Sequence, residues 1–381
     1  MSRAHVVIAG TGIAGLEAAL ALRAFAGDRV AVEMVGPGAR FTVPAAAPGL
    51  VFGVGSGVEA PVETVVAQAG AALRRGRLVA VDPRRHLIML AGGELLTYDR
   101  LVVAVGARAE PHLPEALTFT GYAEVGEVRA LVDGIAHAAA RGARTDLVVV
   151  APPGCGWPLA AYELAVMTRG HLAEQGHPDP GRVTVVTAED TPLAVFGPQA
   201  SDAIAQRMRE AGVDVRAGAA VRAWEWGRLE LAGGETLPAD RVIALPALRG
   251  PGITGLPGDA HGFARTTSRG TARGAPDVWV VGDAGTFPVK QGGIACQQAD
   301  SAAAGIAREL GADVDDLPFE PVLRGWMWDE EGGRFLRADL GGGHTESPGV
   351  TDTAPLWSPV AKVAGRFLAP FLEQLQPLHD R

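Results

Sequence analysis

Cysteine is scarce in this chain, which has only Cys155 and Cys296 among its 381 residues. Two cysteines so far apart do not suggest the disulfide framework of a small secreted protein. No C-x-x-C pair is present, and this excludes a redox dithiol of that kind. The chain therefore has to hold its fold by burying apolar side chains, and its length is sufficient for that.

Long apolar runs are also missing. The best candidate, Leu147–Met167, is interrupted by prolines and glycines and falls short of the ~18 uninterrupted apolar residues of a membrane helix. An apolar strand begins within five residues of the amino terminus, which leaves no room for a signal peptide. We therefore expect a cytoplasmic protein, with peripheral contact at the inner face of a membrane left open.

Positive charge is in deficit. The chain has 34 lysines and arginines against 43 aspartates and glutamates, a formal net charge of -9. Nucleic-acid binding depends on neutralising phosphates with basic side chains, so we exclude nucleic acid as a partner. We also assign no residues to a metal site.

Glycine, by contrast, is abundant, with 51 residues of 381 against an average usage of ~7%. No G-X-Y period accompanies it, which excludes collagen. The length fits two to three domains of ~150 residues each. The glycines gather at particular points, and these clusters carry the functional signal.

The first glycine cluster lies between a predicted strand over 5–9 and a predicted helix over 16–26. Gly10, Gly12 and Gly15 form G-x-G-x-x-G in the strand–turn–helix context that dinucleotide binding requires. Gly10 permits the tight turn, Gly12 lets a pyrophosphate approach the backbone, and Gly15 lets the helix pack closely on the strand. The helix amino terminus favours the phosphates. The cluster predicts a bound dinucleotide.

The next predicted strand, over 29–35, should end in an acidic residue that binds the adenosine ribose. Val35 and Gly36 occupy that place. Glu33 comes two or three positions early, where its side chain can point elsewhere. The sequence therefore leaves the ribose contact open.

Two later segments resemble a known family. Residues 97–107, TYDRLVVAVGA, resemble the T-Y-D-x-L-V-x-A-x-G segment of flavoproteins with two dinucleotide-binding domains, and residues 278–284, VWVVGDA, resemble their second FAD signature. The resemblance covers about residues 5–310 and implies FAD as the cofactor. It assigns Asp283 to the ribityl chain, whereas Asp283 taken alone would be a helix N-cap. The other residues that it implies at the FAD site are Arg40, Pro44, Leu78, Ala104, Gly106 and Gly282.

A second strand–loop–helix unit starts near Thr145 and corresponds to the family's NAD(P)H domain. Anchored on Glu163, the three glycine positions of its G-x-G-x-x-G-x-E loop fall on Gly156, Pro158 and Ala161. Proline has no N–H and carries a ring where a pyrophosphate should meet bare backbone, although it suits the first turn of a helix. The ribose-binding acid would fall near Thr187. These departures argue against ordinary NAD(P)H binding.

Within the family, this pattern resembles the sulfide:quinone oxidoreductase branch, whose second domain no longer serves a nicotinamide. Residues 40–44, RFTVP, resemble that branch's F-V-P segment beside the flavin, and residues 161–163 resemble its A-Y-E. Type II NADH:quinone dehydrogenases also have a glutamate here, so the resemblance implies that Glu163 is a general acid or base. The alternative is a first-turn glutamate that offsets the helix dipole.

The cysteines and the third glycine cluster supply the remaining catalytic candidates. Sulfide oxidation in that branch uses a cysteine pair, and Cys155 and Cys296 do not superpose on its pattern. A helix amino terminus lowers the pKa of a nearby thiol, which makes Cys155 a candidate, while Cys296 suits a small core residue better. Lys290 begins the segment KQGGIACQQA, which resembles the helix lining the quinone site of type II NADH dehydrogenases. The resemblance implies charge beside the flavin, and a solvated lysine is the alternative.

The carboxy-terminal region predicts a hairpin over 317–343 with Trp326 and Trp328, followed by a helical stripe over 360–375 that Pro370 should kink. In quinone-linked relatives such helices touch the membrane. One lysine and one arginine between 360 and 375 offer little attraction to anionic lipid, so docking on this protein or on a dimer partner is favoured.

We predict an α/β fold with two Rossmann-like domains and a carboxy-terminal cap. The predicted bounds are 1–115 with 263–310 for a discontinuous FAD domain, 116–262 for the second domain and 311–381 for the cap. The predicted function is FAD-dependent transfer of two electrons from a small donor, such as sulfide or a thiol, to a quinone or other acceptor. The alternatives are an NAD(P)H:acceptor oxidoreductase and a non-catalytic flavin-binding sensor or interaction protein. A homodimer stays open.

Overall fold

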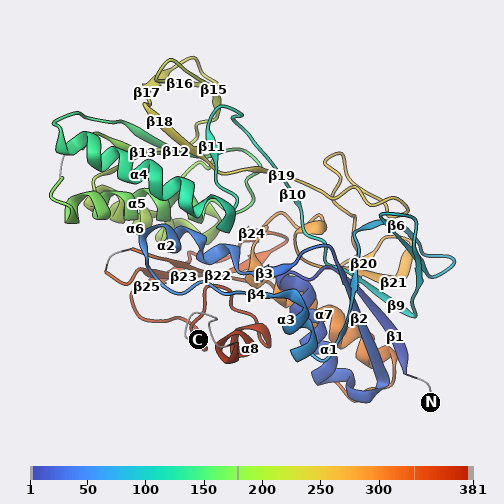
Figure 1. Cartoon of the computed structure of the whole chain (residues 1–381). Helices are drawn as coiled ribbons and strands as arrows, with labels where there is room; N and C mark the ends of the chain where they lie inside the picture. The colour runs from blue at the N-terminus through green and yellow to red at the C-terminus, as the bar shows by residue number, and fades with distance from the viewer. Residues whose placement is uncertain (1–2, 178–179, 330, 376–381) are drawn as a thin grey trace.

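The computed structural model describes residues 3–177, 180–329 and 331–375 and contains two parallel sheets with their own covering layers (Figure 1). The first sheet is parallel except for one short edge strand. Across it the strands are β20 (Thr271–Ala272), β21 (Ala275–Val280), β9 (Arg100–Val103), β1 (Ala4–Ala9), β2 (Val30–Gly36) and β5 (Ala72–Arg75).

Both faces of this sheet are covered, because its central strands are apolar on each side. In β1, Val6 and Ile8 pack among the residues of α1 (Ile13–Ala26) and α7 (Gly292–Glu309), which lie against each other. Val7 and Ala9 pack on the opposite face. That face is covered by an antiparallel meander of β6 (Leu78–Asp82), β7 (Leu87–Leu90) and β8 (Leu95–Thr97).

The second sheet is parallel throughout and repeats this plan. Val149 of its central strand packs among the helices, and Val148 and Val150 pack against a small meander. Across this sheet the strands are β11 (Leu117–Thr118), β18 (Arg241–Ala244), β12 (Leu147–Ala151), β13 (Val183–Thr187) and β14 (Val213–Arg216). The helices are α4 (Val125–Ala140), α5 (Leu159–Glu174) and α6 (Pro198–Glu210). The meander consists of β15 (Val221–Glu225), β16 (Arg228–Leu231) and β17 (Thr236–Pro238).

Short elements join these layers. An antiparallel ribbon of β10 (Arg108–Glu110) and β19 (Ala247–Arg249) connects the two sheets on both passages of the chain. Between β2 and β5 the chain forms β3 (Arg40–Thr42), α2 (Ala47–Phe52), β4 (Glu59–Pro61) and α3 (Val62–Gln68). The predicted α/β fold with two Rossmann-like domains is confirmed by these sheets, and the domain bounds stay a prediction.

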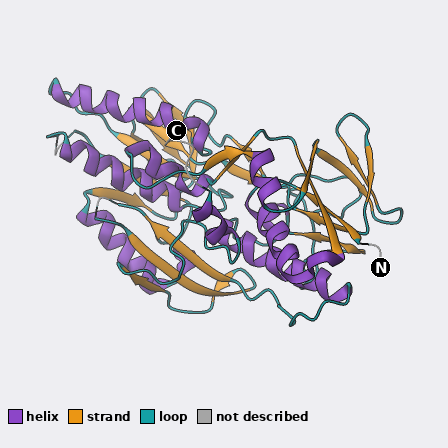
Figure 2. Cartoon of the chain, turned by 60° about the horizontal axis from the view of Figure 1, so that its bottom comes forward, coloured by secondary structure: helices purple, strands orange, loops and turns teal. Residues whose placement is uncertain are grey.

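The carboxy-terminal region forms the predicted hairpin, and the hairpin lies beside α5 and α6 (Figures 1 and 2). Trp328 and Leu336 are buried in the core of the second sheet's helices, which anchors the hairpin there. Its strands are β22 (Val322–Met327), β23 (Arg334–Gly341), β24 (His344–Thr345) and β25 (Val350–Asp352).

The predicted helix over 360–375 is wrong in its extent. Only α8 (Leu368–Gln374) forms, so Pro370 sits in the first turn, where the missing N–H costs no hydrogen bond, and it does not kink a longer helix. The apolar side chains of α8 pack against the first sheet's helices, and Phe367 meets Phe25 of α1 edge to face at 5.4 Å. The carboxy-terminal helix therefore docks on its own chain. No helix within the described ranges is long and apolar enough to cross a membrane.

A buried ion pair fixes the hairpin to α6, and its loss should destabilise the protein. Asp329 accepts from Arg207 Nε at 2.8 Å and from the backbone amide of Gly333 at 2.8 Å, with the two charged side chains 9% and 3% exposed. We expect Asp329→Ala to lower the free energy of unfolding by about 3–5 kcal/mol, measured by urea denaturation. The matched control is Glu230→Ala, which breaks an exposed pair with Arg222 and should cost less than about 1 kcal/mol. Equal losses in the two variants would contradict the buried role.

Candidate functional site

A cavity of about 740 Å³ opens where three parts of the chain meet, a size suited to a cofactor and part of a substrate. The turn between β1 and α1 forms one wall, and the loop and first turns of α5 form another. The carboxy-terminal residues Trp326 and Lys362 close the cavity between these walls.

The predicted glycine cradle has the geometry that its sequence requires. A Cβ at Gly10 would lie 2.1 Å from the carbonyl oxygen of Ala104, and a Cβ at Gly15 would lie 2.1 Å from the carbonyl oxygen of Gly10. These two glycines let the turn and helix α1 pack against the sheet. A Cβ at Gly12 would meet no protein atom within 4 Å, and Gly12 lines the cavity. A phosphate can therefore reach this backbone and the amino terminus of α1.

Asp283 brings a carboxylate to the cavity beside the first glycine cradle. It follows β21, and the amide of Gly282 donates to Gln298 Oε1 at 2.7 Å, which holds this turn in place. Burial raises the pKa of Asp283, and the nearby Lys290 lowers it. Within the described residues no hydrogen bond is recorded to its carboxylate, and it caps no helix, so its oxygens are available to the cavity.

The residues present fit FAD. The open cradle at Gly12 suits a pyrophosphate, and the available carboxylate of Asp283 suits hydroxyl groups. The cavity is also lined by five more of the residues predicted from the resemblance, Pro44, Leu78, Ala104, Gly106 and Gly282. Arg40 is the exception, because its exposed side chain pairs with Glu59 across β3 and β4 and does not line the cavity.

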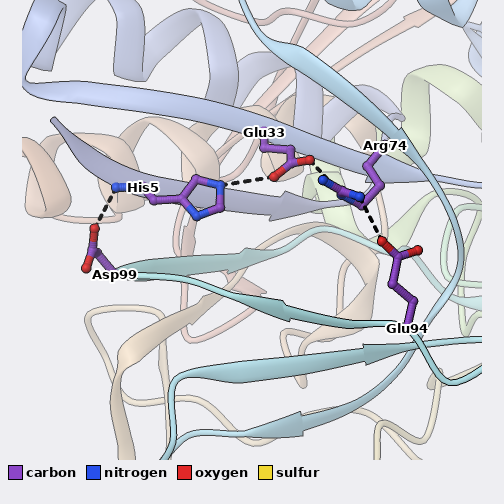
Figure 3. Close-up of polar contacts among 5 residues, drawn as sticks. All are labelled: His5, Glu33, Arg74, Glu94 and Asp99. Atoms are coloured by element: carbon purple, nitrogen blue, oxygen red, sulfur yellow. Dashed lines mark hydrogen bonds and ion pairs between the residues drawn. The ribbon is translucent and has the colours of Figure 1, made fainter.

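Glu33 is held away from the cavity by a polar network on the sheet edge (Figure 3). Its carboxylate bonds His5 Nε2 at 3.0 Å and accepts from Arg74 Nε at 2.7 Å, and Arg74 Nη1 in turn donates to Glu94 at 2.7 Å. Asp99 accepts from the backbone amide of His5 at 2.7 Å. Glu33 therefore ties β2 to its neighbours β1 and β5 and does not line the cavity.

Glu163 lines the cavity as half of a buried ion pair. It is 2% exposed, its Oε1 accepts from the amide of Trp328 at 2.7 Å, and it pairs with the ammonium of Lys362. Lys362 also donates to the carbonyl of Trp326 at 2.6 Å and lies 4.1 Å from the centre of the Trp328 ring. Burial raises the pKa of Glu163 and lowers the pKa of Lys362, and the pairing opposes both shifts. Because α5 has no acidic residue in its first turn, the helix-dipole alternative for Glu163 is wrong.

Lys290 faces the cavity from the segment before α7. Its ammonium donates to the carbonyl of Gly285 and lies 4.1 Å from the centre of the Phe263 ring. Burial lowers the pKa of Lys290 to about 8, with Asp283 opposing the shift. With 8% exposure, Lys290 is not the solvated lysine of the alternative interpretation.

The second glycine loop is packed against this lysine. A Cβ at Gly156 would lie 2.8 Å from Lys290 Cβ and 2.9 Å from Leu248 Cδ1, and the amide of Lys290 donates to the carbonyl of Gly156 at 3.3 Å. Pro158 is the N-cap residue of α5 and brings no amide to the loop. Gly156 is therefore closely packed, as Gly10 is at the corresponding position of the first cradle, while Cys155 and Trp157 on either side of it line the cavity.

Glu189 is an acid after β13 that sequence reasoning missed. It lies two residues beyond Thr187, and its carboxylate accepts from Tyr162 Oη at 3.0 Å and from Thr187 Oγ1 at 3.1 Å. The signal was present in the sequence, since the strand could end one or two residues later than expected. Here Glu189 is engaged by its own domain and does not line the cavity.

The two cysteines lie in different surroundings. Cys155 lines the cavity, and burial, followed by the charge of Glu189, raises the pKa of its thiol to about 12. The expected lowering of this pKa is therefore wrong, because the loss of water outweighs the helix amino terminus. Cys296 is buried among α1 and α7 with its pKa raised well above the ordinary value, and it does not line the cavity. The structure does not bring the two thiols together at this site.

Gln297 and Gln298, which the resemblance places at a quinone site, face other partners. Gln297 exchanges hydrogen bonds with the backbone of Val322 at 2.9 Å in both directions, and Gln298 holds Gly282. The functional residue that the sequence did not single out is Lys362. The chain has two lysines, and both of them line the cavity, a signal that composition alone contained.

The profile of the pyridine nucleotide-disulphide oxidoreductase family matches residues 4–303. Putidaredoxin reductase of Pseudomonas putida is 31% identical over 256 residues, which are 63% of this chain and 57% of that protein. The ferredoxin–NAD(+) reductase component of the p-cumate 2,3-dioxygenase system of the same organism is 27% identical over 67% of this chain and 60% of its own length. The match thus spans less than two thirds of these curated relatives.

The solved structure of the sulfide:quinone oxidoreductase of Aquifex aeolicus has a similar fold. It superposes with a TM-score of 0.77 and 20% identity over 92% of this chain and 87% of that one. At this identity the likeness establishes the fold alone.

Proposed function

Because this chain belongs to the pyridine nucleotide-disulphide oxidoreductase family, whose members bind FAD, we propose that it passes two electrons from a small donor through FAD to a quinone or another small acceptor. FAD, when bound, accepts and releases the electron pair. In this proposal Gly10, Gly12, Gly15 and Asp283 hold FAD. Long-chain quinones dissolve in lipid, so the proposal includes peripheral contact with a membrane.

The observation that carries this proposal is the Glu163–Lys362 pair beside the cavity. Reduction of a quinone to a quinol takes up two protons as well as two electrons, and a hydride from reduced FAD would account for both electrons and one proton. The second proton has to come from an acid beside the cavity. A carboxyl group whose pKa is raised by burial keeps a proton to a higher pH than an exposed glutamate does. Glu163 would donate that proton as a general acid, and Lys362 would hold it in place and offset its charge after the transfer.

Two features favour a donor other than NAD(P)H. Pro158 removes an amide from the second loop, and Glu189 is engaged by Tyr162. Sulfide fits a small site, and its oxidation to the level of elemental sulfur releases two electrons. The raised pKa of Cys155 favours direct reaction of the donor over attack by a cysteine thiolate.

The second candidate function is an NAD(P)H:acceptor oxidoreductase. It is favoured by the names of the curated relatives, one of which is a ferredoxin–NAD(+) reductase component and another an NADH dehydrogenase-like protein of Mycobacterium tuberculosis. For this candidate a pyrophosphate would have to bind the second loop without an amide from Pro158.

Anaerobic mixing of the FAD-loaded protein with each donor tests the two candidates. We expect sulfide to bleach the visible absorption of the flavin and NADH or NADPH to leave it unchanged over the same time. The flavin should then recover when a water-soluble quinone is added. Fast bleaching by either nicotinamide would overturn the choice of donor, and no bleaching by any donor would favour the non-catalytic alternative.

A further inference from the structure

A pair of buried carboxyl groups lies outside the cavity, between the two helices that cover the first sheet. Glu17 of α1 is fully buried, and Asp300 of α7 is 6% exposed. Each carboxyl group shifts the pKa of the other: Asp300 lowers that of Glu17, and Glu17 raises that of Asp300. Neither residue lines the cavity, so the chemistry proposed above does not use them.

Glu17 binds the carboxy-terminal segment. One carboxylate oxygen accepts from the amide of Phe367 at 3.0 Å, and the other accepts from the amide of Leu368 at 2.5 Å. Just before these amides, a Cβ at Gly365 would lie 3.0 Å from Glu17 Oε2 and 2.9 Å from Cys296 Sγ. The segment therefore rests directly on the carboxyl group, and a glycine permits the close approach.

The same segment completes the cavity. Lys362 and Val363 line it, and a Cβ at Gly292, the first residue of α7, would lie 3.0 Å from Val363 Cγ2. The backbone between Lys362 and the two amides held by Glu17 is short. The contact with Glu17 therefore fixes where the ammonium of Lys362 meets Glu163.

The pair has to hold a proton. Asp300 Oδ1 is buried with no hydrogen-bond partner among the described residues, and ionising this carboxyl group beside the buried Glu17 would leave two unshielded negative charges together. The other charged or titratable groups that face the pair are Arg366, from the segment itself, and Cys296, from α7. The guanidinium of Arg366 lies over the rings of Phe25 and Phe367, at 5.7 and 5.5 Å from their centres.

We propose that Glu17 and Asp300, sharing one proton, are positioning residues that hold segment 362–368 against α1 and α7. They so complete the end of the cavity where Lys362 meets Glu163, at which the acceptor is proposed to bind. The role in the acceptor site rests on the proposed function, and the docking of the segment does not. The contact of Glu17 and Asp300 with the segment is pH-sensitive and is separate from the Glu163–Lys362 pair.

The sign of the pH dependence follows from the shared proton. Burial and the charge of Glu17 raise the pKa of Asp300 to about 8 from its ordinary value of 3.8. Undocking admits water to the pair and so lowers the pKa of Asp300 toward its ordinary value, and the docked state therefore keeps a proton that the undocked state loses at lower pH. Docking weakens as pH rises from about 4, and the loss levels off above about 8, where both states are ionised.

Hydrogen–deuterium exchange of the peptide over 363–375 tests the proposal on the full FAD-loaded chain. After correction for intrinsic exchange, we expect the opening constant of this peptide to rise up to about tenfold per pH unit between pH 6 and 8 and to flatten above 8. Asp300→Asn keeps a hydrogen bond to Glu17 but cannot ionise, so the slope should vanish. Glu17→Ala should expose the peptide at every pH.

The matched control is Asp99→Asn. Asp99, next to β9 of the first sheet, also accepts a hydrogen bond from a backbone amide, that of His5, but it is remote from the segment. It should keep the wild-type slope. A slope that survives in Asp300→Asn, or protection that survives in Glu17→Ala, would overturn the proposal. The KM for the quinone, measured in parallel, should lose its rise between pH 6 and 8 in Asp300→Asn. If the protein reduces no quinone, the exchange result still decides the docking role, so the two failures are distinguishable.

Discussion

Replacing Glu163 with glutamine is expected to slow reduction of the acceptor about 10²–10⁴-fold while the flavin is still reduced by the donor at close to the normal rate. Glutamine fills the same space and can still accept the amide of Trp328, but it has no proton to give. Stopped-flow measurement of the two half-reactions separates these effects. The fall in rate at high pH, which reports loss of the proton from Glu163, should disappear in the variant.

Glu189→Gln is the matched control for that experiment. It also removes a half-buried carboxylate beside α5, but from a position outside the cavity. With sulfide as donor, this variant should keep both half-reactions within about twofold. If Glu163→Gln leaves oxidation of the flavin by quinone unchanged, Glu163 is not the proton donor.

Replacing Gly12 with valine should abolish most FAD binding without unfolding the chain. The backbone at Gly12 has φ −88° and ψ −163°, an extended conformation that valine adopts readily, and a Cβ there meets no protein atom within 4 Å. The added side chain would therefore take only the space proposed for the pyrophosphate. We expect FAD to bind at least about a hundredfold more weakly, or about 3 kcal/mol.

Equilibrium dialysis with FAD measures this loss, and circular dichroism checks that the apoprotein is folded. Gly134→Ala is the control, because Gly134 lies on α4, also has no protein atom within 4 Å of a Cβ, and is remote from the cavity. It should leave FAD binding unchanged and stabilise the helix by up to about 1 kcal/mol. Normal FAD content in Gly12→Val would remove the pyrophosphate from this cradle.

The first sheet and its cradle could be predicted because their signals are local. Gly10, Gly12 and Gly15 each answer a requirement of the same short turn, and the apolar run of β1 is visible within six residues. The acceptor of the backbone amides at the start of α8, Glu17, could not be predicted in this way. Glu17 and Leu368 are 351 positions apart, and no periodicity relates them.

Lys362 shows what kind of sequence signal was overlooked. Its contact with Glu163 spans 199 positions, so spacing could not reveal it. Yet arginine supplies nearly all the positive charge of the chain, and its only two lysines, Lys290 and Lys362, line one cavity. Arginine stays charged in proteins, whereas a buried lysine can lose its proton, and burial lowers the pKa of both. Lysine among so many arginines pointed to a site where the proton can leave.

The ribbon of β10 and β19 bears on how the two sheets can move relative to each other. Both passages of the chain between the sheets run through it, paired from Arg108 with Arg249 to Glu110 with Ala247. A double-stranded connection of this kind resists twisting, since rotation of one half would break its ladder, but it bends more easily across its flat face. When a substrate enters, we therefore expect a small hinge bending of the two halves about this ribbon, without rotation of one half relative to the other.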